Sequence, residues 1–270
     1  MKIWLFVLTL LCASAAAGSP SSVQLLTQMS EADVVILGEI HDNPDHHRYQ
    51  AKMIARLRPR AVVYEMLTED QADLVTPDLA SDRDALGATL DWNASGWPDF
   101  NMYAPLFAAN PLAGVYGANV PRDVARQSMD SGIAEAFGEE ASVYGLNEPL
   151  PAEEQMARQV LQKSAHCDAL PNEMLAPMVE IQRLRDAELA RAALEAVNEA
   201  GPPVVVITGN GHARKDWGVP AYLTRLRPEL KVFSLGQGED GAEIEGDFDA
   251  VLSSPAAKRD DPCATFRKDG

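Results

Sequence analysis

The sequence predicts an α/β fold, with a mostly parallel β-sheet flanked by helices and a smaller helical subdomain. Short apolar runs rich in β-branched residues alternate with longer stretches of helical pattern, and this alternation is typical of parallel βαβ units. The runs are almost continuously apolar, as expected for strands covered on both faces. Two of the runs end alike, with Gly38 three residues before His41 and Gly209 three residues before His212.

Six apolar runs are the predicted strands, at residues 34–37, 61–64, 112–116, 142–146, 204–208 and 231–235. A helix is predicted to begin at Asn43 and Pro44, because asparagine caps helices and proline suits the first helical turn. This helix is predicted to end before Pro59. A second helix is predicted over 172–200, where a Gly-Pro pair gives a strong stop signal.

The predicted organisation has a signal peptide at 1–17, an α/β domain at 18–252 and a disordered tail at 253–270. Two helix-rich segments of the domain, at 68–110 and 149–200, are predicted to form the smaller subdomain together, packed over the strand ends. The tail is polar and holds four charged residues in a row, a composition typical of disorder.

The first residues have the pattern of a secretory signal peptide. Lys2 precedes a short apolar stretch, and small residues that suit cleavage follow it, ending at Ala17. The stretch is too short to span a bilayer. Cys12 would be the lipidated residue of a lipoprotein and would tie the protein to a membrane. The residues before it make a poor lipidation box, so the sequence favours simple cleavage and a periplasmic protein.

The chain is strongly acidic, with a formal net charge of −17. This charge argues against nucleic acid and anionic membrane surfaces as partners. After signal cleavage two cysteines remain, Cys167 and Cys263. They either pair, as the oxidising periplasm would allow, or stay free.

Four ionisable residues stand at or just after predicted strand ends: Glu39, His41, Glu65 and His212. Because open α/β sheets build their sites at the carboxyl ends of the strands, these side chains are expected to converge in one cleft. Two carboxylates and two imidazoles suit three tasks. They can ligate a divalent metal, perform acid–base chemistry or position a cofactor.

Aromatic residues crowd into one segment that includes Trp92, Trp97, Phe100 and Tyr103. They form either the core of the helical subdomain or one wall of a pocket for a flat apolar ligand, with a tyrosine available to iron. Carboxylates on such a ligand would need arginines in so acidic a chain. The candidates are Arg122, Arg185 and Arg214.

Seven segments carry a family resemblance. In chain order they read GEIHDNPDHH, YEML, DWNASGWPDFNMYAPLF, NVPRDV, LPAEEQ, SAHCDALPNEMLAPMVEIQRLRDAELA and TGNGHARKDWGVPAYL. Together they resemble the ChaN-type haem-binding uptake proteins of the wider Tiki and erythromycin-esterase superfamily. The resemblance extends over about residues 34–235.

The resemblance implies a parallel α/β domain with a smaller helical domain. In the superfamily, paired GxxH segments and two glutamates mark the site, and here these fall on Glu39, His41, Glu65 and His212. The nearest family members bind a pair of stacked haems across a dimer, with tyrosine ligation. Motifs do not single out that tyrosine. The candidates here are Tyr103, Tyr116, Tyr144 and Tyr222. Haem-uptake members are often lipoproteins, a pattern from which this chain departs.

We therefore expect an exported, homodimeric haem-binding protein that serves haem and iron uptake with an outer-membrane haem receptor system. The alternative is a hydrolase, either an esterase or a peptidase, in which His41 or His212 is the base and Glu39 or Glu65 orients it or ligates a metal. The third reading is a non-catalytic scaffold, in which the polar cluster serves packing alone.

Overall fold

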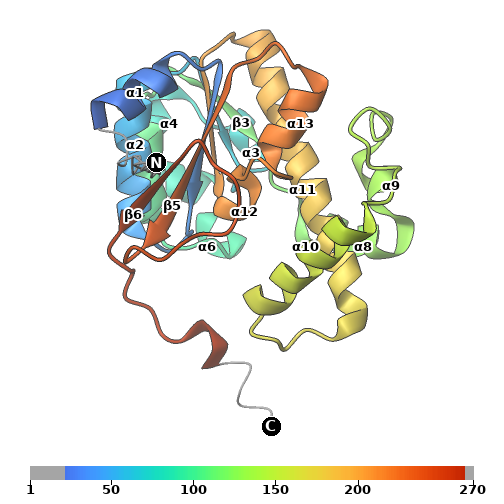
Figure 1. Ribbon diagram of the computed structural model, residues 1–270. Coiled ribbons are helices and arrows are strands. Elements are labelled where there is room, and N and C mark those ends of the chain that lie inside the picture. The colour runs from blue at the N-terminus through green and yellow to red at the C-terminus, as the bar shows by residue number, and fades with distance from the viewer. Residues whose placement is uncertain (1–21, 265–270) are drawn as a thin grey trace, which may run out of the picture.

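The computed structural model describes residues 22–264 and confirms the α/β prediction. Six parallel strands form one sheet in the order β3-β2-β4-β1-β5-β6 (Figure 1). The predicted signal peptide and Cys12 lie outside the described residues. Within 22–264, no helix is both long enough and apolar enough to cross a membrane.

The strands are short and mostly buried. They are β1 (Val34–Glu39), β2 (Ala61–Tyr64), β3 (Gly114–Gly117), β4 (Val204–Gly209), β5 (Val232–Glu239) and β6 (Ala250–Ser254). The central strand β1 pairs with β4 and β5, so that Val34 lies beside both Val204 and Val232. In β1, β2 and β4 every residue is buried, which fits their continuous apolar pattern.

Helices fill the connections between the strands. They are α1 (Ser22–Ser30), α2 (Pro44–Leu57), α3 (Glu69–Asp73), α4 (Pro77–Ser81), α5 (Arg83–Thr89), α6 (Trp92–Ser95), α7 (Phe100–Ala108), α8 (Arg122–Ser131), α9 (Ile133–Phe137), α10 (Ala152–Ala165), α11 (Asn172–Glu199), α12 (Asn210–Ala213), α13 (Val219–Leu226) and the 3₁₀ turn η1 (Pro262–Ala264). Asn43 caps α2 by accepting a hydrogen bond from the Asp45 backbone, as the sequence predicts.

Alternate strand residues enter two separate cores, one on each face of the sheet. Val35 and Leu37 pack in the core that contains α1, α2, α5 and α7. Val34 and Ile36 pack in the core that contains α11 and α13. Figure 1 shows α1 and α2 on one side of the sheet and α11 and α13 on the other. The helices therefore shield both faces and leave the strand ends for a site.

The structure differs from the predicted helical subdomain. Segment 68–110 belongs to one core and α11, within segment 149–200, belongs to the other. Segment 68–110 and α11 therefore lie on opposite faces of the sheet, where each buries apolar residues against the strands.

The predicted strand at 142–146 is wrong, because this segment forms turns. Tyr144 and Leu146 are buried beneath α11, while Val143 is 55% exposed. Gly145 adopts φ +72°, which no strand residue can use. The apolar residues here fill the core from a loop, and a short apolar run does not distinguish the two cases.

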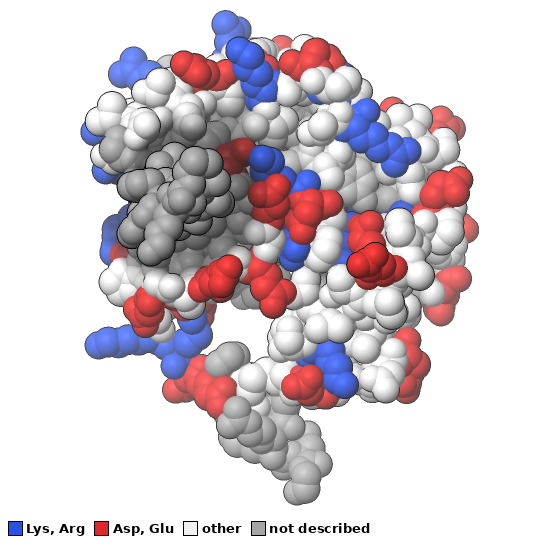
Figure 2. Space-filling model, viewed as in Figure 1, with Lys and Arg blue, Asp and Glu red and all other residues white. Residues whose placement is uncertain are grey.

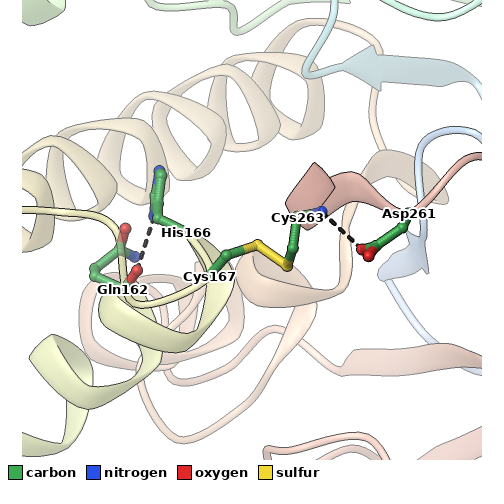
Figure 3. The surroundings of a disulfide bond; sticks show 5 residues. All are labelled: Gln162, His166, Cys167, Asp261 and Cys263. Carbon is green, nitrogen blue, oxygen red and sulfur yellow. Dashed lines mark hydrogen bonds between the residues drawn. A yellow bond between two sulfur atoms is a disulfide. The ribbon is translucent and has the colours of Figure 1, made fainter. Parts of the chain in front are cut away.

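Residues 253–264 differ from the predicted disordered tail, whose last residues, 265–270, lie outside the described part of the chain. Ser253 and Ser254 finish β6, which pairs with β5. Cys263 forms a disulfide bond with Cys167, with Cα atoms 5.6 Å apart (Figure 3). Of the two states that the sequence left open for these cysteines, the structure shows the paired one.

Candidate functional site

The predicted site residues meet at the carboxyl ends of three neighbouring strands, β2, β4 and β1. Glu39 is the last residue of β1 and His41 lies two residues beyond it. Glu65 directly follows β2, and His212 lies in α12, the short helix after β4. The strand-end argument therefore places all four side chains correctly.

Glu65 is the centre of this cluster. Its Oε2 atom accepts hydrogen bonds from the Thr208 hydroxyl and the Gly209 backbone N–H, each at 2.7 Å. Its Oε1 atom lies 4.0 Å from His41 Nε2 and 3.7 Å from His212 Nε2. Burial alone would raise the pKa of Glu65, but the two imidazoles and the two hydrogen bonds together lower it to about 2.

Both imidazoles are held in the same way. His41 Nδ1 lies 2.8 Å from Glu39 Oε1, and His212 Nδ1 lies 2.7 Å from Asp186 Oδ1. Burial opposes protonation of both rings, yet Glu65 and Glu39 raise the pKa of His41 to about 9, and Glu65 and Asp186 raise the pKa of His212. Each ring therefore has a carboxylate on Nδ1 and presents Nε2 toward Glu65.

Glu39 is itself fixed from behind. The Tyr103 hydroxyl donates to Glu39 Oε1 at 3.0 Å, and His47 Nδ1 lies 3.4 Å from Glu39 Oε2. The rings of His47 and Tyr103 pack against each other with centroids 4.2 Å apart. Tyr103 is fully buried, at 0% exposure, and lies beneath His41, where its hydroxyl is out of reach of a bound ligand.

The glycines of the two GxxH segments allow the strand ends to approach closely. A Cβ on Gly209 would lie 3.0 Å from His41 Nε2. A Cβ on Gly38 would lie 2.5 Å from Asn210 Oδ1 and 2.9 Å from the Leu235 carbonyl oxygen. A side chain at Gly38 would therefore collide with its neighbours, and one at Gly209 would crowd the His41 imidazole.

A cavity of about 480 Å³ opens above the cluster, a volume within the usual range for ligand sites. Its lining residues are His41, Glu65, Ala94, Ser95, Gly96, Trp97, Ala118, Asn119, Val120, Arg122, Gln182, Arg185 and His212. The Trp97 ring meets the His41 ring edge-on, with centroids 5.0 Å apart. One wall is therefore aromatic, and the floor is the ionisable cluster.

Two arginines line this cavity without a carboxylate partner. Within the described part of the chain, neither Arg122 nor Arg185 forms an ion pair or a side-chain hydrogen bond. Arg122 lies against Gly96, where a Cβ would be 2.5 Å from its Nη2 atom. Acidic side chains are spread over the face shown in Figure 2. Two unpaired guanidinium groups in a chain of net charge −17 favour an anionic ligand.

The remaining candidates lie elsewhere. Arg214 pairs with Asp216 and stacks on Trp217, with its guanidinium carbon 3.5 Å from the ring centroid. The Tyr116 hydroxyl donates to Glu199. Tyr144 and Tyr222 line a different cavity, which is bordered by α10 and α13. None of these residues lines the cavity above Glu65.

The divalent-metal site that the sequence allows on the four strand-end residues is not supported. Over residues 22–264, no group of three or more His, Cys, Asp or Glu side chains is arranged to hold a metal ion. Glu39 lies behind His41, and Glu65 Oε2 already accepts two hydrogen bonds. The four donors therefore do not face a common point at bonding distance.

Sequence reasoning missed Asp186, Thr208 and Gln182. Asp186 and Gln182 reach the site from α11, far from any strand end. The sequence does hold one signal, because Asp186 stands among the buried residues Leu184, Ala187 and Leu189. A carboxylate on the apolar side of a helix needs a partner, and here the partner is His212.

The comparisons with known proteins agree with this architecture. The family model described as haem-binding uptake, Tiki superfamily, ChaN matches residues 25–223. The solved structure described as cofacial heme binding to ChaN of Campylobacter jejuni matches with a TM-score of 0.59 and 21% identity, over 86% of this chain and 91% of that chain. At this identity the likeness shows the fold.

A second solved structure, the type III effector HopBA1, matches with a TM-score of 0.49 and 12% identity, over 89% of this chain and 95% of that chain. A search of the curated proteins found no match. Because the family model matches well over half of the 270 residues, the chain belongs to the haem-binding uptake family, the ChaN group of the Tiki superfamily.

Proposed function

We propose that the cavity above Glu65 binds haem. The observation that carries the proposal is the pair of unpaired arginines, Arg122 and Arg185, in the same cavity as Trp97 and an accessible imidazole. Haem is a flat apolar ring with two carboxylates and an iron atom. An aromatic wall suits the ring, the two guanidinium groups suit the carboxylates, and an imidazole nitrogen suits the iron.

The donor set fits haem through histidine. The side chain of His41 is 35% exposed, whereas that of His212 is 9% exposed, so His41 Nε2 is the more accessible nitrogen. Because the raised pKa of His41 keeps the ring protonated at neutral pH, Nε2 would release its proton on binding the iron. Glu39 on Nδ1 fixes the ring, as carboxylates commonly do for metal-bound histidines. When bound, haem supplies the iron and its redox and ligand-binding chemistry. Tyrosine ligation, as the resemblance implies, would need a tyrosine from outside this cavity.

The compartment and the biological role extend the proposal. We infer export to the periplasm from the signal-peptide pattern of residues 1–17. The disulfide between Cys167 and Cys263 supports an oxidising compartment. A role in haem and iron uptake accords with the family description. A homodimeric assembly and an outer-membrane haem receptor system as partner complete the proposal.

A haemin titration followed by absorbance tests the proposal. The wild-type protein is expected to show saturable binding with a shifted Soret band. The Arg122→Ala, Arg185→Ala double variant is expected to bind at least about tenfold more weakly, because charge-assisted hydrogen bonds contribute about 1.5–3 kcal/mol each. Arg56→Ala is the matched control, since Arg56 is exposed on α2 and does not line the cavity.

The outcomes distinguish whether the protein binds haem at all from whether haem binds in this cavity. No saturable binding by the wild type would reject haem as the ligand. Equal affinity of the double variant and Arg56→Ala would reject this cavity as the site. His41→Ala is expected to change the absorption spectrum of the bound haem, and Tyr116→Phe is expected to leave it unchanged.

One observation favours a hydrolase as the second candidate. Asp186 and His212 form a close carboxylate–imidazole pair that faces Glu65, an arrangement suited to proton transfer. With a pKa raised to about 9, His41 is protonated at neutral pH and would hold an anion or donate a proton. An esterase and peptidase screen tests this candidate, and equal turnover by wild type and His212→Ala would reject it.

A further inference from the structure

A segment at the C-terminus links two walls of the ligand cavity. We name residues 255–264, which follow β6, the C-terminal strap. Figure 1 shows it leaving the sheet beside the ends of β5 and β6 and extending away from the body of the molecule. Its Cys263 is bonded to the loop between α10 and α11. One wall of the cavity is the loop after β1, which carries His41. Another is α11, which carries Gln182 and Arg185.

The first anchor of the strap is ionic. Arg259 Nε and Nη2 donate to the Asp42 carboxylate at 2.6 and 2.7 Å, and its guanidinium donates to Glu239 at 2.7 Å. Glu239 also accepts hydrogen bonds from the Ala257 backbone and the Asn43 side chain. Since Asp42 directly follows His41, this anchor holds the strap to the histidine loop.

The second anchor is covalent. Cys263 is bonded to Cys167, which lies in the short loop between α10 and α11, and its backbone N–H donates to Asp261 (Figure 3). From that loop α11 runs to Gln182, about 15 Å along the helix axis at 1.5 Å per residue. The disulfide thus reaches the cavity through the rigid body of α11.

Helices α10 and α11 form a helical hairpin, and few buried contacts hold the end of it that carries Cys167. Among the 14 residues of α10 only Arg158 is buried, and among residues 172–180 of α11 only Leu175 and Val179 are buried. The strap itself is mostly exposed, and Figure 2 shows it standing clear of the body of the molecule. A segment with so few buried contacts has low local stability, so the anchors decide where it sits.

We propose that the C-terminal strap is a positioning element that holds the α11 wall at a fixed distance from the His41 loop, so that ligand affinity depends on the Cys167–Cys263 bond. The proposal rests on the proposed haem site. Reduction by a dithiol would transfer two electrons and two protons to the bond, giving two thiols and a dithiol-derived disulfide. The hairpin end would then be free, and the cavity would lose its defined width.

The test compares a Cys167→Ser, Cys263→Ser double variant with the wild type. Both cysteines are replaced by serine because free thiols can bind haem iron. Reducing the wild-type protein would create such thiols and would obscure the effect on haemin affinity. Hydrogen exchange is expected to rise in α10 and in residues 172–186, while the strands keep their protection. The Kd for haemin is expected to rise about fivefold or more, a size typical of coupled sites.

A second variant keeps the test decisive if the serine variant folds poorly. Arg259→Ala removes the ionic anchor and leaves the disulfide, so it is expected to shift exchange and Kd in the same direction by a smaller amount. Arg259→Lys is expected to recover part of the loss. Arg227→Ala is the matched control, because Arg227 forms an exposed ion pair with Glu229 away from the cavity.

The two proposals can fail separately. If the wild type does not bind haemin, the proposed function fails. The positioning role of the strap is then tested only by comparing hydrogen exchange of residues 172–186 between the wild type and the anchor variants. If the wild type binds haemin but neither anchor variant changes exchange or Kd, the strap proposal is overturned and the haem site stands.

Discussion

At the scale of single residues, side chains behind the site hold the side chains that face the cavity. Tyr103 is the clearest example. The sequence makes it a candidate iron ligand, but its hydroxyl donates to Glu39 and its ring packs on His47 and Trp92. A phenol that is fully buried and hydrogen-bonded to a carboxylate has a raised pKa and cannot readily ionise to bind iron. It supports His41 through Glu39.

The charge of His41 predicts how stability depends on pH. Its pKa is raised from 6.5 to about 9 in the folded protein, so folding favours the protonated ring. The resulting stabilisation is fully present below pH 6.5 and is lost as pH rises through about 9. The free energy of unfolding of the wild type minus that of His41→Ala is therefore expected to shrink between pH 6.5 and 9, as measured by urea denaturation.

The same series in the Glu65→Gln background provides the control. Glu65 is a main cause of the raised pKa of His41, so the pH dependence is expected to weaken there. A difference between wild type and His41→Ala that stays constant from pH 6 to 10 would show that the ring is not held in its charged form.

At the scale of elements, the parallel sheet could be predicted because its strands are nearly continuous apolar runs. The predicted strand 61–64 coincides with β2, and those at 34–37, 204–208 and 231–235 overlap β1, β4 and β5. The strand β6 was missed because it lies at the edge of the sheet, where Val251 is exposed and its apolar run is only three residues long. Edge strands lack the signal that burial on both faces imposes.

The site could be predicted only where it follows the strands. Strand ends are fixed by the sheet, so the apolar runs of the sequence suffice to place Glu39, His41 and Glu65 at one edge. Asp186 and Arg185 come from the middle of α11, and their place depends on how that helix crosses the sheet. Helix packing is a tertiary property that the sequence of one helix does not encode.

The close approach of elements around β1 gives a second prediction. Asn210 links α12 to β5 through two hydrogen bonds with the Gln237 backbone, at 2.7 and 2.9 Å. A Cβ on Gly38 would collide with Asn210 and with a backbone oxygen of β5. Gly38→Ala is therefore expected to lower the free energy of unfolding by about 1–3 kcal/mol, the usual cost of overpacking.

Gly211→Ala is the matched control for this prediction. Gly211 lies in the same GxxH segment as Gly209, but a Cβ there would meet nothing within 4 Å. Its unfolding free energy is expected to stay within about 0.5 kcal/mol of the wild type. Equal losses of unfolding free energy in Gly38→Ala and Gly211→Ala would mean that the close contacts of Gly38 with Asn210 and β5 are not the cause of the loss.

At the scale of the whole molecule, the disulfide joins parts of the chain that are far apart in sequence. Cys167 and Cys263 are separated by 96 residues, and the loop between them contains all of α11 and the strands β4, β5 and β6. Breaking this bond leaves the core residues unchanged. Its main effect on stability is thus expected in the unfolded chain, which gains conformational freedom when the loop is opened.

The Cys167→Ser, Cys263→Ser variant is therefore expected to lose about 2–5 kcal/mol of unfolding free energy, measured by guanidinium denaturation. Reduced wild type is expected to match the variant, and added reductant is expected to leave the variant unchanged. This loss is global, whereas the strap proposal concerns exchange confined to α10 and residues 172–186. If the variant keeps the wild-type unfolding free energy but exchanges faster in α10 and residues 172–186, the disulfide serves only to position this hairpin. Closing the loop would then have little effect on the free energy of the unfolded chain.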